Sequence, residues 1–130
     1  MATLTPTLTL ASTDAASDEL SFSVTDSLTV KAPSQNLSTV IAGTGGGDTI
    51  IKTATTNTVY LFVRHTATTD GSTATAHQLD VEDTGNTGHA RLKAGEWLFM
   101  PFSSAAANVG IQLQTTSGNI QVEYGYWTQA

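Results

Sequence analysis

Hydrophobic and polar residues alternate along most of this chain with a period of two, which predicts β-strands that bury one face. From Leu20 to Val30, apolar residues hold nearly all the even positions. This run predicts either one long strand or two strands joined at Asp26. Helical periodicity is nearly absent, so the sequence predicts an all-β fold. Further strands are expected at residues 36–42, 49–53, 57–66, 77–82, 89–92, 96–102, 109–115 and 119–127.

The segment 57–66 is the most hydrophobic of these strands. It carries aliphatic residues on one face and two aromatic residues, Tyr60 and Phe62, on the other, so both faces need cover and we expect an interior strand of a sheet. The expected strands recur about every eight to twelve residues, a spacing typical of a sandwich or barrel. We therefore expect residues 20–130 to form a single antiparallel β-sandwich.

The N-terminal residues 1–19 are expected to form an extended arm or edge strand followed by a loop. Leu4, Leu8 and Leu10 alternate with threonines, and Pro6 confines the segment to an edge strand or an extended arm because it cannot donate to a ladder. No charged side chain guards this strand against pairing with another chain. We therefore expect the arm to add to the sheet of an adjacent subunit, with the three leucines as candidate interface residues.

The hydroxyl content changes how the strand surfaces are interpreted. The chain of 130 residues has 24 threonines and 11 serines, but only 5 Lys+Arg and 11 Asp+Glu. With 39% hydrophobic residues the low charge does not indicate disorder. Threonine favours extended backbone and keeps an outward face wettable without charge, but it does not protect strand edges as lysine does. The composition favours a surface that neighbouring subunits cover.

The charge balance and the absence of cysteine exclude several classes of function. Five cations in a chain of net charge −6 cannot form a basic patch, so no direct nucleic-acid binding is expected. Without cysteine there is no disulfide, thiolate metal site or cysteine nucleophile. No signal-peptide pattern and no apolar run long enough to span a membrane is found, so we expect a soluble protein without a membrane partner.

Candidate catalytic and metal-binding residues are few. Asp80, Glu82 and Asp83 lie near one predicted turn and are weak candidates for a calcium site, although an acidic, solvated hairpin is the favoured interpretation. His65 and two further histidines at residues 77 and 89 are spaced twelve apart, which is also the hairpin period, so no metal site is expected from them. No catalytic motif is found. We expect neither an enzyme nor a bound cofactor.

The large aromatic residues of the second half allow two interpretations. An exposed row of them would stack on sugar rings, as in carbohydrate-binding modules. Packing is favoured for Trp97, which heads an apolar run, and for Tyr124 and Tyr126, which continue the apolar positions of their strand. Trp127 falls on the opposite face of that strand and is the aromatic residue expected at an interface or surface.

Four segments of the second half carry a resemblance to a known class of protein. They are an aromatic strand at residues 59–64, an acidic strand at 79–83, a strand, turn and strand at 90–99 that contain Leu-Lys-Ala-Gly-Glu, and a closing strand with Val-Glu-Tyr at 118–124. This series resembles a recurrent pattern in small virion proteins of tailed bacteriophages. The resemblance covers about residues 57–130, and the Thr/Ser-rich first half is similar to such proteins in composition only.

The resemblance implies a non-enzymatic role in a virus particle. It implies a β-sandwich, often jelly-roll-like, that decorates or cements a capsid by binding its outer surface. The implied partners are the major capsid protein and other copies of the same chain, for example in a trimer. The implied location is the capsid surface of the virion, after synthesis in the host bacterial cytoplasm. The alternative is a tail, fibre or receptor-binding β-module that recognises carbohydrate.

Overall fold

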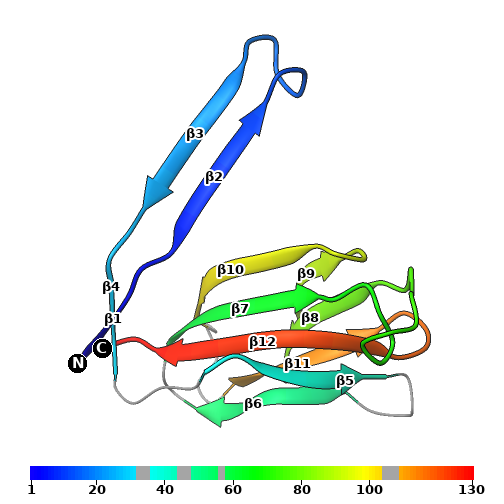
Figure 1. The fold of residues 1–130 in the computed structure, drawn as a ribbon. Helices are drawn as coiled ribbons and strands as arrows, with labels where there is room; N and C mark the ends of the chain where they lie inside the picture. The colour runs from blue at the N-terminus through cyan, green and yellow to red at the C-terminus, as the bar shows by residue number, and fades with distance from the viewer. Residues whose placement is uncertain (32–35, 44–47, 56–57, 104–108) are drawn as a thin grey trace.

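A computed structural model describes residues 1–31, 36–43, 48–55, 58–103 and 109–130 (Figure 1). The regular secondary structure in these ranges consists of β-strands, which confirms the all-β prediction. They contain no helix long and apolar enough to cross a membrane. Asn57, expected to begin a strand, lies outside the described residues. The strands are β1 Ala2–Leu4, β2 Thr7–Ser12, β3 Leu20–Thr25, β4 Leu28–Val30, β5 Ser38–Ala42, β6 Thr49–Thr55, β7 Val59–His65, β8 Leu79–Asp83, β9 Gly88–Leu92, β10 Trp97–Phe102, β11 Val109–Thr115 and β12 Ile120–Thr128.

Strands β5 to β12 form two packed antiparallel sheets with a nested pairing pattern. The first strand of the set, β5, pairs with the last, β12, and the inner pairs are β6 with β11, β7 with β10 and β8 with β9. The sheet orders are β10-β7-β12-β5 and β6-β11-β8-β9 (Figure 1). A long hairpin rolled up in this way is a jelly roll. The predicted antiparallel, jelly-roll-like sandwich is therefore confirmed.

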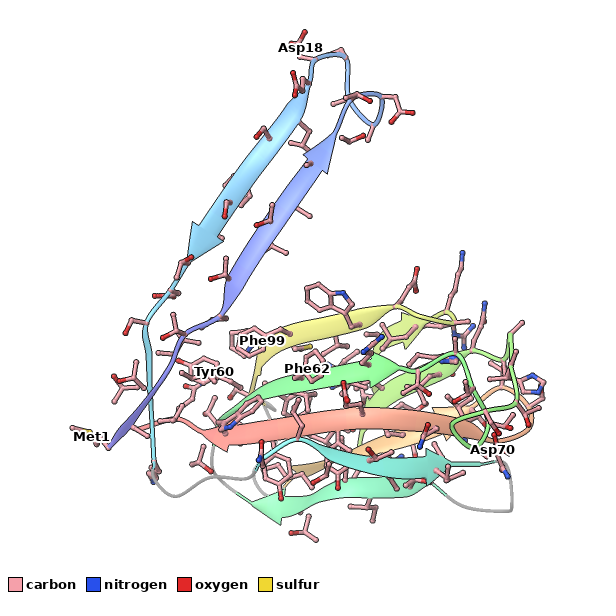
Figure 2. The ribbon with its side chains drawn as sticks, in the orientation of Figure 1. Met1, Asp18, Tyr60, Phe62, Asp70 and Phe99 are labelled. Atoms are coloured by element: carbon pink, nitrogen blue, oxygen red, sulfur yellow. The ribbon has the colours of Figure 1, made fainter. Side chains whose placement is uncertain are left out.

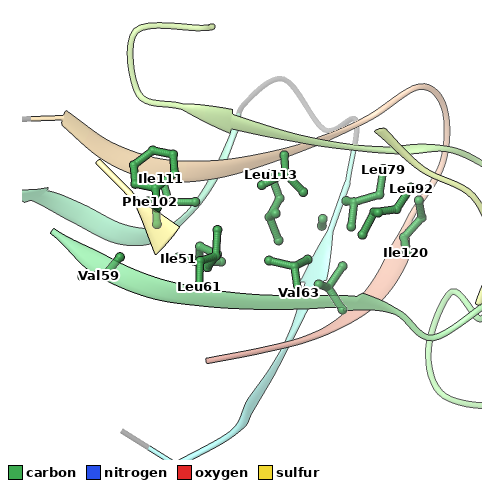
Figure 3. Close-up of a cluster of buried hydrophobic side chains, with 13 residues drawn as sticks. Ile51, Val59, Leu61, Val63, Leu79, Leu92, Phe102, Ile111, Leu113 and Ile120 are labelled. Carbon is green, nitrogen blue, oxygen red and sulfur yellow. The ribbon is translucent and has the colours of Figure 1, made fainter. Parts of the chain in front are cut away.

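The core lies between these sheets and follows the alternation in the sequence. Along β7, residues Val59, Leu61 and Val63 are fully buried and point toward the opposite sheet, where Leu113 and Ile111 meet them (Figure 3). Full burial of one such side chain contributes about 1.5–3 kcal/mol relative to an exposed one. Strand β7 lies between β10 and β12, as expected of an interior strand.

The first thirty residues form a separate hairpin that differs from the expected boundary. Strand β1 pairs with β4 and β2 with β3 in one unchanged register, from Ala2 opposite Val30 to Ser12 opposite Leu20. Residues 20–30, which the sequence placed in the sandwich, therefore belong to the arm. Alternation predicts a strand without identifying its partner, and here the nearest partner along the chain is the one that pairs.

Within this hairpin, which we call the arm (residues 2–30), the ladder is interrupted where Pro6 lies opposite Asp26. Proline cannot donate, and the one bond made at this point runs from the backbone N–H of Asp26 to the Pro6 carbonyl at 3.1 Å. The interruption separates β3 from β4, so residues 20–30 form two strands joined at Asp26 and not one long strand. Beyond it, β2 and β3 project away from the sandwich (Figure 1).

The base of the arm is joined to the sandwich by the C-terminal strand. The N–H of Lys31 donates to the carbonyl of Thr128 at 2.9 Å, and the N–H of Ala130 donates to Thr29 at 3.1 Å. Val30 is buried at this junction and bridges to Gln129. The arm is thus joined to the sandwich at its root, while the far ends of β2 and β3 project away from it (Figure 1).

Candidate interaction surface

One face of the projecting hairpin is apolar and exposed. The register places Leu8 opposite Val24 and Leu10 opposite Phe22, so cross-strand partners share this face. Each of the five apolar side chains exposes between 37% and 48% of its surface. Contiguous exposed apolar patches are uncommon on folded proteins and are enriched at interaction sites, which makes this face a candidate interaction surface. We call this set the arm face: Leu8, Leu10, Leu20, Phe22 and Val24.

The opposite face of the hairpin is polar without being charged. The hydroxyls of Thr7 and Thr25 are 2.8 Å apart, and those of Thr9 and Ser23 are 3.2 Å apart. Such cross-strand hydroxyl pairs stabilise the ribbon and keep its outer side wettable. The arm is therefore amphipathic, with its apolar side uncovered in the single chain.

The tip of the arm is acidic. Asp14, Asp18 and Glu19 are all exposed there, and Asp18 lies at the end most distant from the sandwich (Figure 2). The Ser12 hydroxyl accepts hydrogen bonds from the N–H groups of Ala15 at 3.0 Å and Asp14 at 3.3 Å, which shapes the turn. The turn thus holds three negative charges at the far end of the arm face.

The outer face of the β10-β7-β12 sheet is rich in aromatic residues. Cross-strand pairing places Phe99 opposite Phe62, and Tyr60 lies between Pro101 and Trp127. The rings of Tyr60 and Phe99 stack with centroids 6.2 Å apart at 13° (Figure 2). This set is the second half of the candidate surface. We call it the aromatic face: Tyr60, Phe62, Trp97, Phe99, Pro101 and Trp127.

The two tryptophans differ from expectation. Trp97 exposes 52% of its surface, so the prediction that it packs inside is wrong. Its cross-strand partner is Arg64, an outward position of β7, which places the indole on the outer face. Trp127 is only partly exposed, and its ring lies over Gly125, where a Cβ would come within 2.8 Å of the indole. Trp127 reaches the outer face as predicted, and its indole is partly covered there.

The arm face and the aromatic face meet in a continuous apolar cleft. One hollow of about 280 Å³ is lined by Leu8 and Val24 from the arm and by Tyr60, Phe99 and Pro101 from the sheet. A second hollow of about 280 Å³ adjoins it. Its lining includes Leu4, Pro6, Leu37, Phe62, Phe99 and Trp127. The predicted interface residues Leu4, Leu8 and Trp127 therefore line one cleft, while Leu10 lies further out on the arm.

A third hollow lies at the other end of the aromatic face. It has a volume of about 430 Å³ and is lined by Phe62, Arg64, Gly95, Trp97 and Glu123. The guanidinium of Arg64 is 3.8 Å from the Glu123 carboxylate and half exposed. An exposed indole beside a cation and a carboxylate offers both stacking and hydrogen bonding to a ligand.

The three calcium candidates have separate partners. The Asp80 carboxylate accepts from the Arg91 guanidinium at 2.6 and 3.0 Å, and Glu82 accepts from the Gln112 amide at 3.2 Å. Asp83 accepts from the N–H groups of the following turn. Across the described ranges, no group of three or more histidine, aspartate and glutamate side chains is placed to hold a metal ion. Asp80 and Glu82 are partly exposed on this hairpin, whereas Asp83 is buried.

Asp83 closes the β8–β9 turn. Its carboxylate accepts from Gly85 N at 2.8 Å and Thr87 N at 3.1 Å, and His89 Nε2 lies 3.2 Å away. Burial alone would raise the pKa of Asp83, but the hydrogen bonds from Thr87, His89 and Gly85 together lower this pKa below its ordinary value. The lowered pKa favours the charged form that holds the turn.

The histidines do not converge. His65 is buried, its Nδ1 accepts from Ala67 N at 2.9 Å, and its Nε2 donates to the His77 carbonyl at 2.8 Å. The His77 ring is 2.8 Å from the Ser117 hydroxyl, and the His89 ring packs against Phe102 with centroids 5.1 Å apart. Each ring thus stabilises a different loop or strand end.

Sequence reasoning missed the residues of β3 and β7 that complete this surface. The sequence places Phe22 and Val24 in a strand of the expected sandwich, and it places Phe62 on a strand face that needs cover without identifying the neighbour that provides it. The signal that identifies them is the pairing register, which places Phe22 opposite Leu10 on the arm and Phe62 opposite Phe99 on the sheet. Comparisons with protein-family models, curated proteins and solved structures give no match to this chain.

Proposed function

We propose that this protein is a non-enzymatic phage virion structural protein of the capsid decoration, or cement, type. In this role it binds the outer surface of the capsid and stabilises the shell, with the major capsid protein and other copies of itself as partners. The observation that carries the proposal is the apolar arm face, which is held outside the folded sandwich and left uncovered.

The architecture supports this proposal because it separates a rigid body from an attachment element. The jelly roll recurs in viral capsid proteins as well as in lectins, so the fold alone does not decide between them. The arm adds a specific attachment element, since burying its exposed apolar side chains against a neighbour would stabilise the association through the hydrophobic effect. The resemblance of residues 57–130 to small virion proteins points the same way.

The arm would act by face-to-face packing instead of strand addition. Its strands β2 and β3 already pair with each other along their whole length, so a neighbour has only the two outer edges to extend. The apolar side chains, in contrast, are available at once. Burying one large apolar side chain fully is worth about 1.5–3 kcal/mol, and these five are already about half covered, so a favourable contact of several kcal/mol remains before association costs.

The proposal is tested on purified virions of the phage that encodes this chain. Quantitative mass spectrometry should find the protein with a copy number comparable to that of the major capsid protein. A number far below that would place it in the tail or portal region, and absence from the particle would overturn the proposal. Particles stripped of the protein should rebind the wild-type chain and rebind Leu10→Ser/Phe22→Ser poorly, whereas Thr9→Ala/Ser23→Ala on the polar face should bind normally.

The second candidate is a receptor-binding β-module that recognises carbohydrate. The hollow between Trp97, Arg64 and Glu123 favours it, because a flat exposed indole beside charged hydrogen-bonding groups suits a sugar ring. A glycan array probed with the wild-type protein, with Trp97→Ala and with Trp127→Ala decides between the candidates. Selective glycan binding that Trp97→Ala abolishes would support the receptor-binding module over the cement protein.

A further inference from the structure

We propose that the apolar cleft of one copy receives the arm of a second copy of this chain, so that the protein self-associates by exchanging arms. This inference rests on the proposed function in treating the arm as an assembly element, and it identifies the partner that covers it. It concerns the free protein as well as the particle-bound one.

Both halves of the required interface are present in one chain. The arm face is a ridge of aliphatic residues and Phe22, and the aromatic face beside it is apolar from Pro101 to Trp97. The arm leaves most of its own aromatic face open, because only Leu8 and Val24 at the near ends of β2 and β3 line the cleft, and the far ends of these strands project away from the sheet (Figure 2). Leu10 and Phe22 therefore stay 46% and 48% exposed in the single chain.

The dimensions of the two faces match. Strands β2 and β10 have six residues each, so both extend for about 20 Å at roughly 3.4 Å per residue. An arm laid along β10 and β7 at the ordinary sheet-to-sheet spacing of about 10 Å brings its apolar side chains onto the aromatic rings. The two-stranded arm is also as wide as the β10-β7 pair that would receive it.

The uncovered apolar area makes up a large part of what a specific interface buries. The five side chains of the arm face, together with Trp97 at 52% exposure, amount to on the order of 500 Å² of uncovered apolar surface per chain. Each copy would place its arm in the cleft of a neighbour and receive a neighbour's arm in its own cleft. The apolar surface buried in this way, together with its surrounding rim, approaches the roughly 800 Å² per partner of a standard interface.

The charges give the docked arm a direction. Asp14, Asp18 and Glu19 at the tip are exposed, and Arg64 and Lys93 are exposed at the Trp97 end of the aromatic face. The other end of the cleft, at the arm root, is lined by a carboxylate, that of Asp26. An arm that enters with its tip toward Trp97 places its carboxylates near Arg64 and Lys93, although Glu123, 3.8 Å from Arg64, and the exposed Glu96 offset part of this attraction. The reverse direction brings the acidic tip to Asp26. The match in length, width and uncovered apolar area favours a second copy as the occupant, whereas the net charge of −6 on each chain opposes association.

Sedimentation velocity over a range of micromolar to sub-millimolar concentrations tests the association. The wild-type chain should form oligomers, and Leu10→Ser/Phe22→Ser should weaken association by about 30-fold or more, as expected for loss of central apolar contacts. The matched control Thr9→Ala/Ser23→Ala, on the opposite side of the same strands, should associate like the wild type. Circular dichroism and thermal melting should show an intact sandwich in each variant, since neither pair of residues contacts the core.

Charge reversal in two separate chains tests the partner and the direction. Asp18→Lys/Glu19→Lys at the tip and Arg64→Glu/Lys93→Glu on the sheet should each weaken self-association by about 3- to 10-fold, and a mixture of the two variants should associate more strongly than either alone. Lys93→Glu alone, which leaves the Arg64–Glu123 pair intact, serves where the double change disturbs folding. Failure of the mixture to recover association would overturn the proposed direction.

The outcomes separate this inference from the proposed function. A wild-type chain that stays monomeric at all concentrations, or an oligomer that the arm-face variant leaves unchanged, overturns the arm exchange even if the protein is found on capsids. An arm-dependent oligomer that is absent from purified virions supports the exchange and overturns the cement function.

Discussion

Asp83 and Asp80 show how two neighbouring carboxylates can have different roles. Asp83 is buried and accepts hydrogen bonds from two backbone N–H groups and from His89, whereas Asp80 pairs with Arg91 at the surface. Because the pKa of Asp83 is lowered, its contribution to stability is complete above the ordinary carboxyl pKa and is lost as the pH falls through the lowered value.

Substitution of these two residues should have unequal costs. Asp83→Ala leaves the N–H groups of Gly85 and Thr87 without their acceptor, so we expect the free energy of unfolding to fall by about 1–3 kcal/mol. Asp80→Ala removes an ion pair whose Arg91 side chain is 59% exposed and leaves no backbone N–H group without an acceptor, so it should cost about 0–1 kcal/mol. Urea denaturation at neutral pH measures both. Equal losses would contradict this difference in roles, and a melting temperature that rises with added calcium in the wild type and in neither variant would indicate a calcium site.

The two tryptophans show that the sequence predicts which face of a strand a side chain occupies but not whether that side chain is exposed. Alternation correctly predicts that Trp127 faces away from Val122 and Tyr126, but it carries no information on what covers that outer face. Trp97 was expected to pack because of its apolar run, yet it projects outward beside Arg64. Exposure depends on long-range contacts with neighbouring layers, and the arm lies over only one end of this sheet.

At the scale of elements, the strands of the sandwich follow from the alternation alone. The expected segments at 57–66 and 109–115 differ from β7 and β11 by no more than two residues at either end. The partner of residues 20–30 could not be predicted in the same way, since a strand with one apolar face pairs equally well with any strand that continues that face. Because the connection between β2 and β3 is short, closing this local hairpin costs less chain entropy than pairing β3 with a strand distant in the sequence.

Gly110 is required for the pairing of β11 with β6. A Cβ at this position would overlap the carbonyl oxygen of Lys52 and lie 2.8 Å from the nitrogen of Ala54, at a point where the register between the two strands shifts. Both are backbone atoms, so they cannot move aside as the end of a side chain would. Glycine is therefore the residue that permits this irregular ladder.

Two glycine substitutions should separate this requirement from a general loss of flexibility. Gly110→Ala should lower the free energy of unfolding by at least about 2 kcal/mol, because it forces backbone apart inside the sandwich. Gly88→Ala in β9 meets nothing within 4 Å and should change stability by less than about 0.5 kcal/mol. Thermal and urea melts of both variants provide the comparison, and similar losses in the two would contradict the steric explanation.

On the scale of the whole molecule, the chain combines a sandwich that buries its own apolar core with an arm whose apolar face stays exposed. The jelly roll buries aliphatic residues from both sheets, and its strands β7, β12, β11 and β8 each have two neighbours. The outer arm has only two strands and buries none of its residues. An isolated two-stranded ribbon is marginally stable in water, so the arm lacks the packing that would hold it in place.

This contrast predicts a concentration-dependent protection pattern in amide hydrogen exchange. In dilute protein, the amides of β2 and β3 should exchange much faster than those of β7 and β12, because the ribbon opens without disturbing the core. As the concentration rises and arms dock on neighbouring copies, exchange in β2, β3 and the outer face of β10 should slow together, while β8 and β11 stay unchanged. Leu10→Ser/Phe22→Ser should keep the fast pattern at every concentration. An arm as protected as the sandwich in dilute solution would mean that its apolar face is covered within one chain, and the exchange of arms would then have no driving force.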